Sequence, residues 1–111
     1  MPSIKLETSA ALTKLQEQTL ALEITEIASA MLNKPVEVIQ VRVAGNLTLT
    51  FGGAPADDSA FLEIALIGNI RDEVKAELPK TFAELFKKYG IDPKKLFLHY
   101  TETTPSAWGW L

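Results

Sequence analysis

Proline at position 2 is the residue of this sequence with the clearest potential for chemistry. Aminopeptidases remove an initiator methionine when the next residue is small, as Pro2 is, and the product carries a free secondary amine. An α-amino group titrates near about 8, and burial or a neighbouring cation lowers that pKa. Such an amine could act as a neutral base at physiological pH. Taken alone, Pro2 is better explained as a common second residue, and its nitrogen is an amide while Met1 is attached.

Lys34 and His99 are the other polar side chains that could take part in a reaction. Lys34 stands between a predicted helix and a predicted strand, where it could bind a carboxylate and depress the pKa of a nearby amine. A solvated lysine near a helix C-terminus is the simpler interpretation. Phe97 and His99 lie two residues apart on a predicted strand and therefore share one face. His99 could donate a hydrogen bond or titrate there, but composition alone favours the filling of an interface.

Both tryptophans lie in the C-terminal run Trp108-Gly109-Trp110. Tryptophans in such a tail are more often packing anchors, commonly at an interface, than ligand contacts. Gly52-Gly53 lacks the spacing of a phosphate-binding loop and is interpreted as a turn. The glutamates of the predicted helices follow solvent faces, and we expect neither a metal site nor a cofactor.

Composition excludes several classes of function. The 111 residues include no cysteine and one histidine, so a disulfide scaffold, a thiolate metal site and a thiol nucleophile are ruled out. With 11 basic and 14 acidic residues the formal charge is −3, and no basic run favours nucleic acid. The sequence shows no secretory signal and no apolar stretch long enough to span a membrane. We therefore expect a cytoplasmic protein that binds neither nucleic acid nor membrane.

Apolar periodicity and chain-breaking residues predict the elements that must position these side chains. Strands are expected where apolar residues alternate or β-branched residues are frequent, and helices where apolar residues recur every three or four positions. The expected strands are 3–7, 36–43, 47–51, 60–67 and 95–100, and the expected helices are 12–32, ended by Asn33-Lys34-Pro35, and a second one capped by Asp72. Leu15 is assigned to the apolar face of the first helix, and strand 60–67 is expected to be buried on both faces. Pro79 should kink the second helix or displace its start.

The two halves of the chain match at one offset. Pro35 and Pro93 each follow a helix and precede a strand, 58 residues apart, and the apolar positions of the strands and helices keep the same spacing. The chain is thus one α/β (α+β) domain over 1–111 with pseudo-repeats at about 2–51 and 60–103. Two β-α-β units side by side make a four-stranded sheet with both helices on one face. The bare face predicts an oligomer whose sheets face one another.

Six short motifs occur in order along almost the whole chain. They are Met1-Pro2, Asn33-Lys34-Pro35, Phe51-Gly52-Gly53, Leu66-Ile67-Gly68, Gly90-Ile91-Asp92-Pro93 and Trp108-Gly109-Trp110. No single motif is specific, but the ordered set resembles the macrophage migration inhibitory factor family, within the tautomerase superfamily. The resemblance implies a homotrimer with sheets inside, helices outside and an active site at each subunit boundary.

The resemblance also implies cofactor-independent keto–enol tautomerisation of phenylpyruvate-like or dopachrome-like substrates. Pro2 would be the base once Met1 is gone, Lys34 would bind the substrate carboxylate, and the backbone of Ile67 would contribute a hydrogen bond. His99 stands where the family usually has asparagine, which contacts substrate from the neighbouring subunit. Trp108 and Trp110 would line the pocket or its rim.

Two departures from the family pattern alter the expected pocket. Phe97 stands where many members carry tyrosine, and Val38 where some carry a second tyrosine, so phenolic hydroxyls are missing and the substrate stays open. The missing cysteines exclude the thiol-redox motif of some members. A second hypothesis is a cytokine-like module that binds a protein receptor, with a vestigial tautomerase pocket and release from the cell without a signal peptide.

Overall fold

A computed structural model describes residues 1–111, in which six strands and two long helices follow one another. The bounds are β1 (Ser3–Thr8), α1 (Lys14–Leu32), β2 (Gln40–Ala44), β3 (Leu49–Phe51), β4 (Ala54–Ala56), β5 (Ala60–Ile67), α2 (Asp72–Lys87) and β6 (Leu96–Thr103). Three short 3₁₀ turns complete the chain, at Val36–Val38, Pro93–Lys95 and Pro105–Ala107. No helix is long and apolar enough to cross a membrane.

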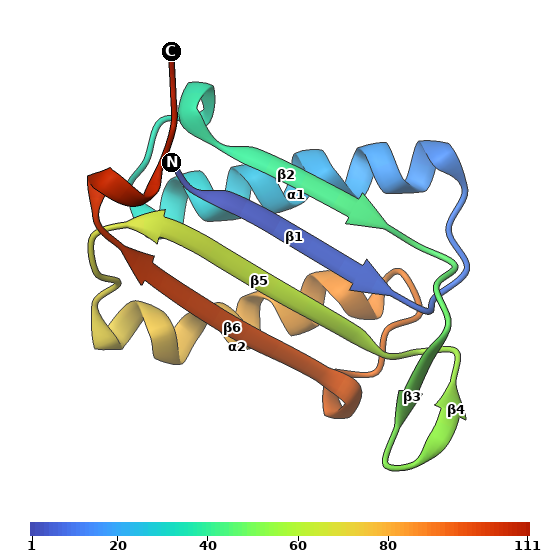
Figure 1. The fold of residues 1–111 in the computed structure, drawn as a ribbon. Coiled ribbons are helices and arrows are strands. Elements are labelled where there is room, and N and C mark those ends of the chain that lie inside the picture. The colour runs from blue at the N-terminus through green and yellow to red at the C-terminus, as the bar shows by residue number, and fades with distance from the viewer.

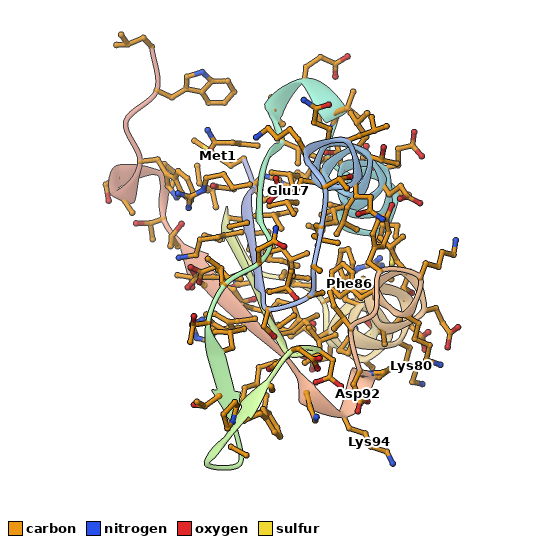
Figure 2. All side chains as sticks on the ribbon, turned by 90° about the vertical axis from the view of Figure 1, so that its right-hand side faces the viewer. Met1, Glu17, Lys80, Phe86, Asp92 and Lys94 are labelled. Atoms are coloured by element: carbon orange, nitrogen blue, oxygen red, sulfur yellow. The ribbon has the colours of Figure 1, made fainter.

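The main sheet has the strand order β2-β1-β5-β6. β1 pairs in parallel with β2, β5 pairs in parallel with β6, and β1 and β5 are antiparallel at the centre. Each helix connects the two parallel strands of its own half, and both helices lie on one side of the sheet (Figures 1 and 2). The predicted fold class and the two β-α-β repeats are therefore confirmed.

The core lies between the sheet and the two helices. The buried residues of α1 are Leu20, Ile24 and Ala28, one helical turn apart, and the residues 58 positions later, Leu78, Phe82 and Phe86, are the fully buried residues of α2. In Figure 2 Phe86 points into the layer between the sheet and α2. The same offset thus repeats the same buried stripe, which explains why one pattern recurs in both halves.

The other face of the sheet is covered by no helix (Figure 2). Strand β5 alternates between fully buried residues and partly exposed ones, so the prediction that it is buried on both faces is wrong for the single chain. The pairing of the four strands places Arg42, Lys5, Glu63 and His99 in one row across this bare face.

Two predicted strands differ from the structure at their start, and a third differs at its end, since β6 extends to Thr103 rather than to residue 100. Residues 36–38 form a 3₁₀ turn, because the amides of Val38 and Ile39 bond back to Pro35 and Val36, and β2 begins only at Gln40. Strand 47–51 begins at Leu49 and pairs with β4, which the sequence analysis missed. The alanine- and proline-rich β4 has low strand propensity, and its pairing comes from the predicted Gly52-Gly53 turn.

The predicted helix starts also need correction. α1 begins at Lys14, because Thr13 accepts a hydrogen bond from the Gln16 amide and forms a capping box, and Leu15 is 71% exposed. α2 is capped at Arg71 without a side-chain hydrogen bond, so Asp72 is its first residue rather than its cap. Pro79 lies inside α2 and does not displace its start.

Candidate active site

The N-terminus, the end of β5 and the loop between α1 and β2 meet at one edge of the sheet (Figure 1). Ser3 pairs with Ala65 in the antiparallel register of β1 and β5. Continuing that register by one residue puts Pro2 opposite Leu66, next to Ile67. Two of the predicted site residues, which are 65 positions apart in the sequence, are thus brought together by strand pairing.

Pro2 is buried at this edge. It is among the side chains less than 2% exposed, and its carbonyl accepts a hydrogen bond from the Gln40 amide at 3.1 Å. The amino group of Met1 lies one residue further out, and burial, followed by the positive charge of Lys34, lowers its pKa. The environment at this chain end therefore favours a neutral amine, as expected for a base.

Lys34 is held in place by its backbone. The chain leaves α1 through Asn33 in a left-handed conformation, with φ of 54°. The Lys34 amide then donates to the Ser29 carbonyl, and the Ser29 hydroxyl donates to the Lys34 carbonyl at 2.6 Å. These bonds fix the direction in which the chain leaves the helix. Lys34 lines a cavity together with Ile67 and Gly68.

That cavity has a volume of about 590 Å³, within the range of about 300–1,000 Å³ that is common for small-molecule sites. Its walls come from the end of α1, the end of β5 and the start of α2. Gly68 allows β5 to turn sharply into this wall, because its φ of 97° suits glycine. The cavity therefore places Lys34 and Ile67 on one concave surface.

A second, smaller cavity of about 330 Å³ adjoins the N-terminus and is lined by Met1, Pro2, Trp108 and Trp110. The Trp108 indole N–H donates to the Thr103 hydroxyl at 2.6 Å, which fixes this tryptophan against the end of β6. Trp110 is 66% exposed. Figure 2 shows Met1 at the end of the sheet from which this C-terminal tail departs.

Phe97 and His99 lie on the bare face of the sheet and line neither cavity. Phe97 is 64% exposed and packs beside Phe51, with ring centroids 5.5 Å apart. The Nδ1 atom of His99 lies 3.4 Å from Glu63, and its ring stacks on Phe61. Within one chain these two residues do not join the predicted site.

Two polar residues of the larger cavity, Asn69 and Arg71, were not predicted from the sequence. Both stand in the loop that follows β5. They come just after a buried strand, at the sheet edge where Pro2 precedes β1. No cluster of three ligating side chains could hold a metal ion.

Comparison with known proteins gives the family. The sequence profile of the macrophage migration inhibitory factor (MIF) matches residues 1–111. The chain belongs to the macrophage migration inhibitory factor family. A comparison with curated proteins finds no significant match.

Solved structures of MIF homologues share the fold. A MIF-like protein from Entamoeba histolytica superposes with a TM-score of 0.89 at 25% identity, covering 99% of this chain and 95% of that one. A MIF homologue from Prochlorococcus marinus gives a TM-score of 0.87 at 18% identity, covering 98% and 95% of the two chains. A protein from Sebaldella termitidis described as a domain of unknown function (DUF1904) gives 0.74 at 14% identity, covering 99% and 95%. The MIF fold places the chain in the tautomerase superfamily, which suggests isomerase-type activity.

Proposed function

We propose that this MIF-family chain is a cofactor-independent keto–enol tautomerase of phenylpyruvate-like or dopachrome-like substrates. Pro2 acts as the general base once Met1 has been removed. The observation that carries the proposal is the position of Pro2, buried opposite the end of β5, at a chain end where burial and the charge of Lys34 lower the pKa of the terminal amine. An amine with a lowered pKa is neutral, and able to accept a proton, at a pH where an ordinary amine is largely charged.

Removal of Met1 transfers the free amine to Pro2. The Pro2 side chain is less than 2% exposed while Met1 is attached, and the new amine lies one residue closer to the sheet than the Met1 amine, so desolvation is expected to act on it as well. Desolvation and a nearby ammonium both disfavour the protonated form. Both effects therefore support a base that works near neutral pH.

In the proposed reaction the Pro2 nitrogen takes a proton from the carbon next to the substrate carbonyl. The electron pair of the broken carbon–hydrogen bond forms the enol double bond, and the protonated amine then gives its proton to the carbonyl oxygen. Lys34 binds the substrate carboxylate, the backbone of Ile67 contributes a hydrogen bond, and Trp108 and Trp110 line the entrance. The amine is regenerated, so no cofactor is consumed.

We also propose a homotrimer in which the bare sheet faces lie inside. Phe97 is 64% exposed and the His99 side chain 60% exposed, so a neighbouring subunit is needed to cover them. In such a trimer these two residues would complete the site of the adjacent protomer. Light scattering at micromolar concentration tests the assembly, and a stable monomer would contradict it.

The activity is tested by enol–keto exchange of phenylpyruvate with protein whose N-terminus is confirmed by intact mass. Protein that retains Met1 should be slower by about 10²–10⁴-fold, the usual contribution of a general base. Pro2→Gly should also be slower, and its rate should rise with pH through a different pKa. Equal rates for the Met1-free protein and Pro2→Gly would rule out Pro2 as the base.

A second candidate is a cytokine-like module that binds a protein receptor. The exposed aromatic side chain of Trp110 favours it, because large exposed aromatic residues are typical of interfaces. Full retention of Met1 in the native source would support this candidate over catalysis, since an amide nitrogen cannot act as a base.

A further inference from the structure

Two cations line the larger cavity without a partner. Lys34 comes from the loop before β2 and Arg71 from the loop before α2, and neither forms an ion pair with a carboxylate of the chain. We propose that this cavity binds two anionic groups at once, and that Arg71 selects 2-oxo acids that carry a second carboxylate. This inference rests on the proposed function, in which Lys34 holds the first carboxylate.

No carboxylate of the chain competes for this cavity, since none of the residues lining it is acidic. Glu102, whose carboxylate bonds to a backbone amide of the cavity wall, accepts hydrogen bonds from the Ile70 amide at 2.7 Å and from Lys75 at 3.0 Å. Its charge is therefore already engaged with other groups. A dianionic ligand would supply the negative charge that Lys34 and Arg71 lack.

Arg71 is an unfavourable residue for the position it occupies. It is the N-cap of α2 and makes no capping hydrogen bond, because a guanidinium has no acceptor atom. The equivalent position in the first repeat, 58 residues earlier, is Thr13, which caps α1 through its side chain. A cation at a helix N-terminus also opposes the helix dipole. Helix stability thus gives no reason for arginine here, whereas an anion in the cavity does.

The rest of the cavity suits a small acid with a short carbon body. Asn33 and Asn69 add amide groups that can donate hydrogen bonds, and Leu66, Ile67 and Val74 supply apolar wall. One cation comes from the loop that follows α1 and the other from the loop that precedes α2, and both loops lie at the edge where β5 ends (Figure 1). They can therefore hold two carboxylates at separate points of the cavity. Arginine also binds carboxylates with two parallel hydrogen bonds, which lysine cannot do.

The test compares a monocarboxylate with a dicarboxylate. We measure kcat/KM for phenylpyruvate and for oxaloacetate in the Met1-free protein and in Arg71→Gln, and compare the ratio of the two kcat/KM values between these proteins. The ratio should shift against oxaloacetate by about tenfold or more, because one charge-assisted hydrogen-bonded pair is lost, and the loss should appear in KM. Lys80→Gln is the matched control, because Lys80 belongs to the same helix but lies in an exposed ion pair with Glu77. An unchanged ratio in Arg71→Gln would overturn the inference.

Binding provides a readout that does not depend on turnover. Calorimetry with succinate and with butyrate should give tighter binding of succinate to the unmodified protein, and Arg71→Gln should abolish the difference while Arg71→Lys should keep part of it. If succinate binds in this way but phenylpyruvate is not turned over, the proposed function fails and the dianion site stands. If phenylpyruvate is turned over and succinate binds no better than butyrate, the dianion site fails and the proposed function stands.

Discussion

Pro79 leaves a gap in the hydrogen bonds of α2 that a tyrosine of the sheet fills. Proline has no N–H, so the carbonyl of Lys75, four residues earlier, loses its helical partner. The Tyr100 hydroxyl donates to that carbonyl at 3.3 Å. Tyr100→Phe keeps the aromatic ring, over which the Lys75 ammonium lies at 5.9 Å, and removes only this bond.

The expected cost follows from the length of the bond. An O–H···O bond is usually about 2.7–2.8 Å long, so the 3.3 Å bond from Tyr100 is longer than usual, and we expect it to contribute less than an average hydrogen bond. We expect Tyr100→Phe to lower the free energy of unfolding by about 0.5–1 kcal/mol. This corresponds to a Tm lower by about 2–6 °C for a chain of this size.

A double-mutant cycle isolates the effect. Pro79→Ala restores an N–H to the Lys75 carbonyl and should itself raise the free energy of unfolding. In the Pro79→Ala protein, Tyr100→Phe should cost less than in the unmodified protein, because the carbonyl keeps a partner. Urea unfolding of all four proteins at one protein concentration provides the measurement. An equal cost in both backgrounds would refute the idea that the tyrosine replaces the missing amide.

Three further predictions concern packing and pH. Gly45→Ala should lower the free energy of unfolding by about 1–3 kcal/mol, because its Cβ would lie 2.9 Å from Leu12; Gly109→Ala, with nothing within 4 Å, should be neutral in the same urea assay. Burial and an acidic hydrogen-bond partner raise the pKa of Tyr89 to about 12. The contribution of Tyr89 to the free energy of unfolding is therefore complete below the ordinary tyrosine pKa, and it is lost as the pH rises through the raised pKa of the folded protein. Absorbance titration should show this late ionisation disappear in Tyr89→Phe. The hydrogen bonds from the Ile70 amide and from a lysine lower the pKa of Glu102. Its contribution to the free energy of unfolding is therefore present above the ordinary glutamate pKa, and it is lost as the pH falls through the lowered pKa of the folded protein. Identical acid unfolding of Glu102→Gln and the unmodified protein would contradict this.

The repeat explains how much of the fold the sequence predicts. Helix and strand periodicities depend on residues close together in the chain, and one offset of 58 residues links Leu20 with Leu78 and Ile24 with Phe82, all of which are fully buried. The errors lie where local patterns compete. The β-branched run after Pro35 predicts strand, yet its first three residues form a 3₁₀ turn.

The candidate site divides in the same way. Pro2, Lys34 and Ile67 were recognised in the sequence from their motifs, and the structure brings them to one edge of the sheet. Arg71 was not recognised, because it lies outside the six motifs and directly before a predicted helix. Its importance depends on the cavity that it shares with Lys34, and a cavity is a property of three elements at once.

The sequence by itself determined the two β-α-β units, the stripe of buried residues and the chemical types available, including the absence of cysteine. These follow from periodicity and composition, which are local. Only the tertiary structure decided that partial burial and the charge of Lys34 lower the pKa of the amine at the chain end, and that two unpaired cations line one cavity. Burial and electrostatic interactions depend on distances through space, and strand pairing sets those distances between residues that are far apart in the chain.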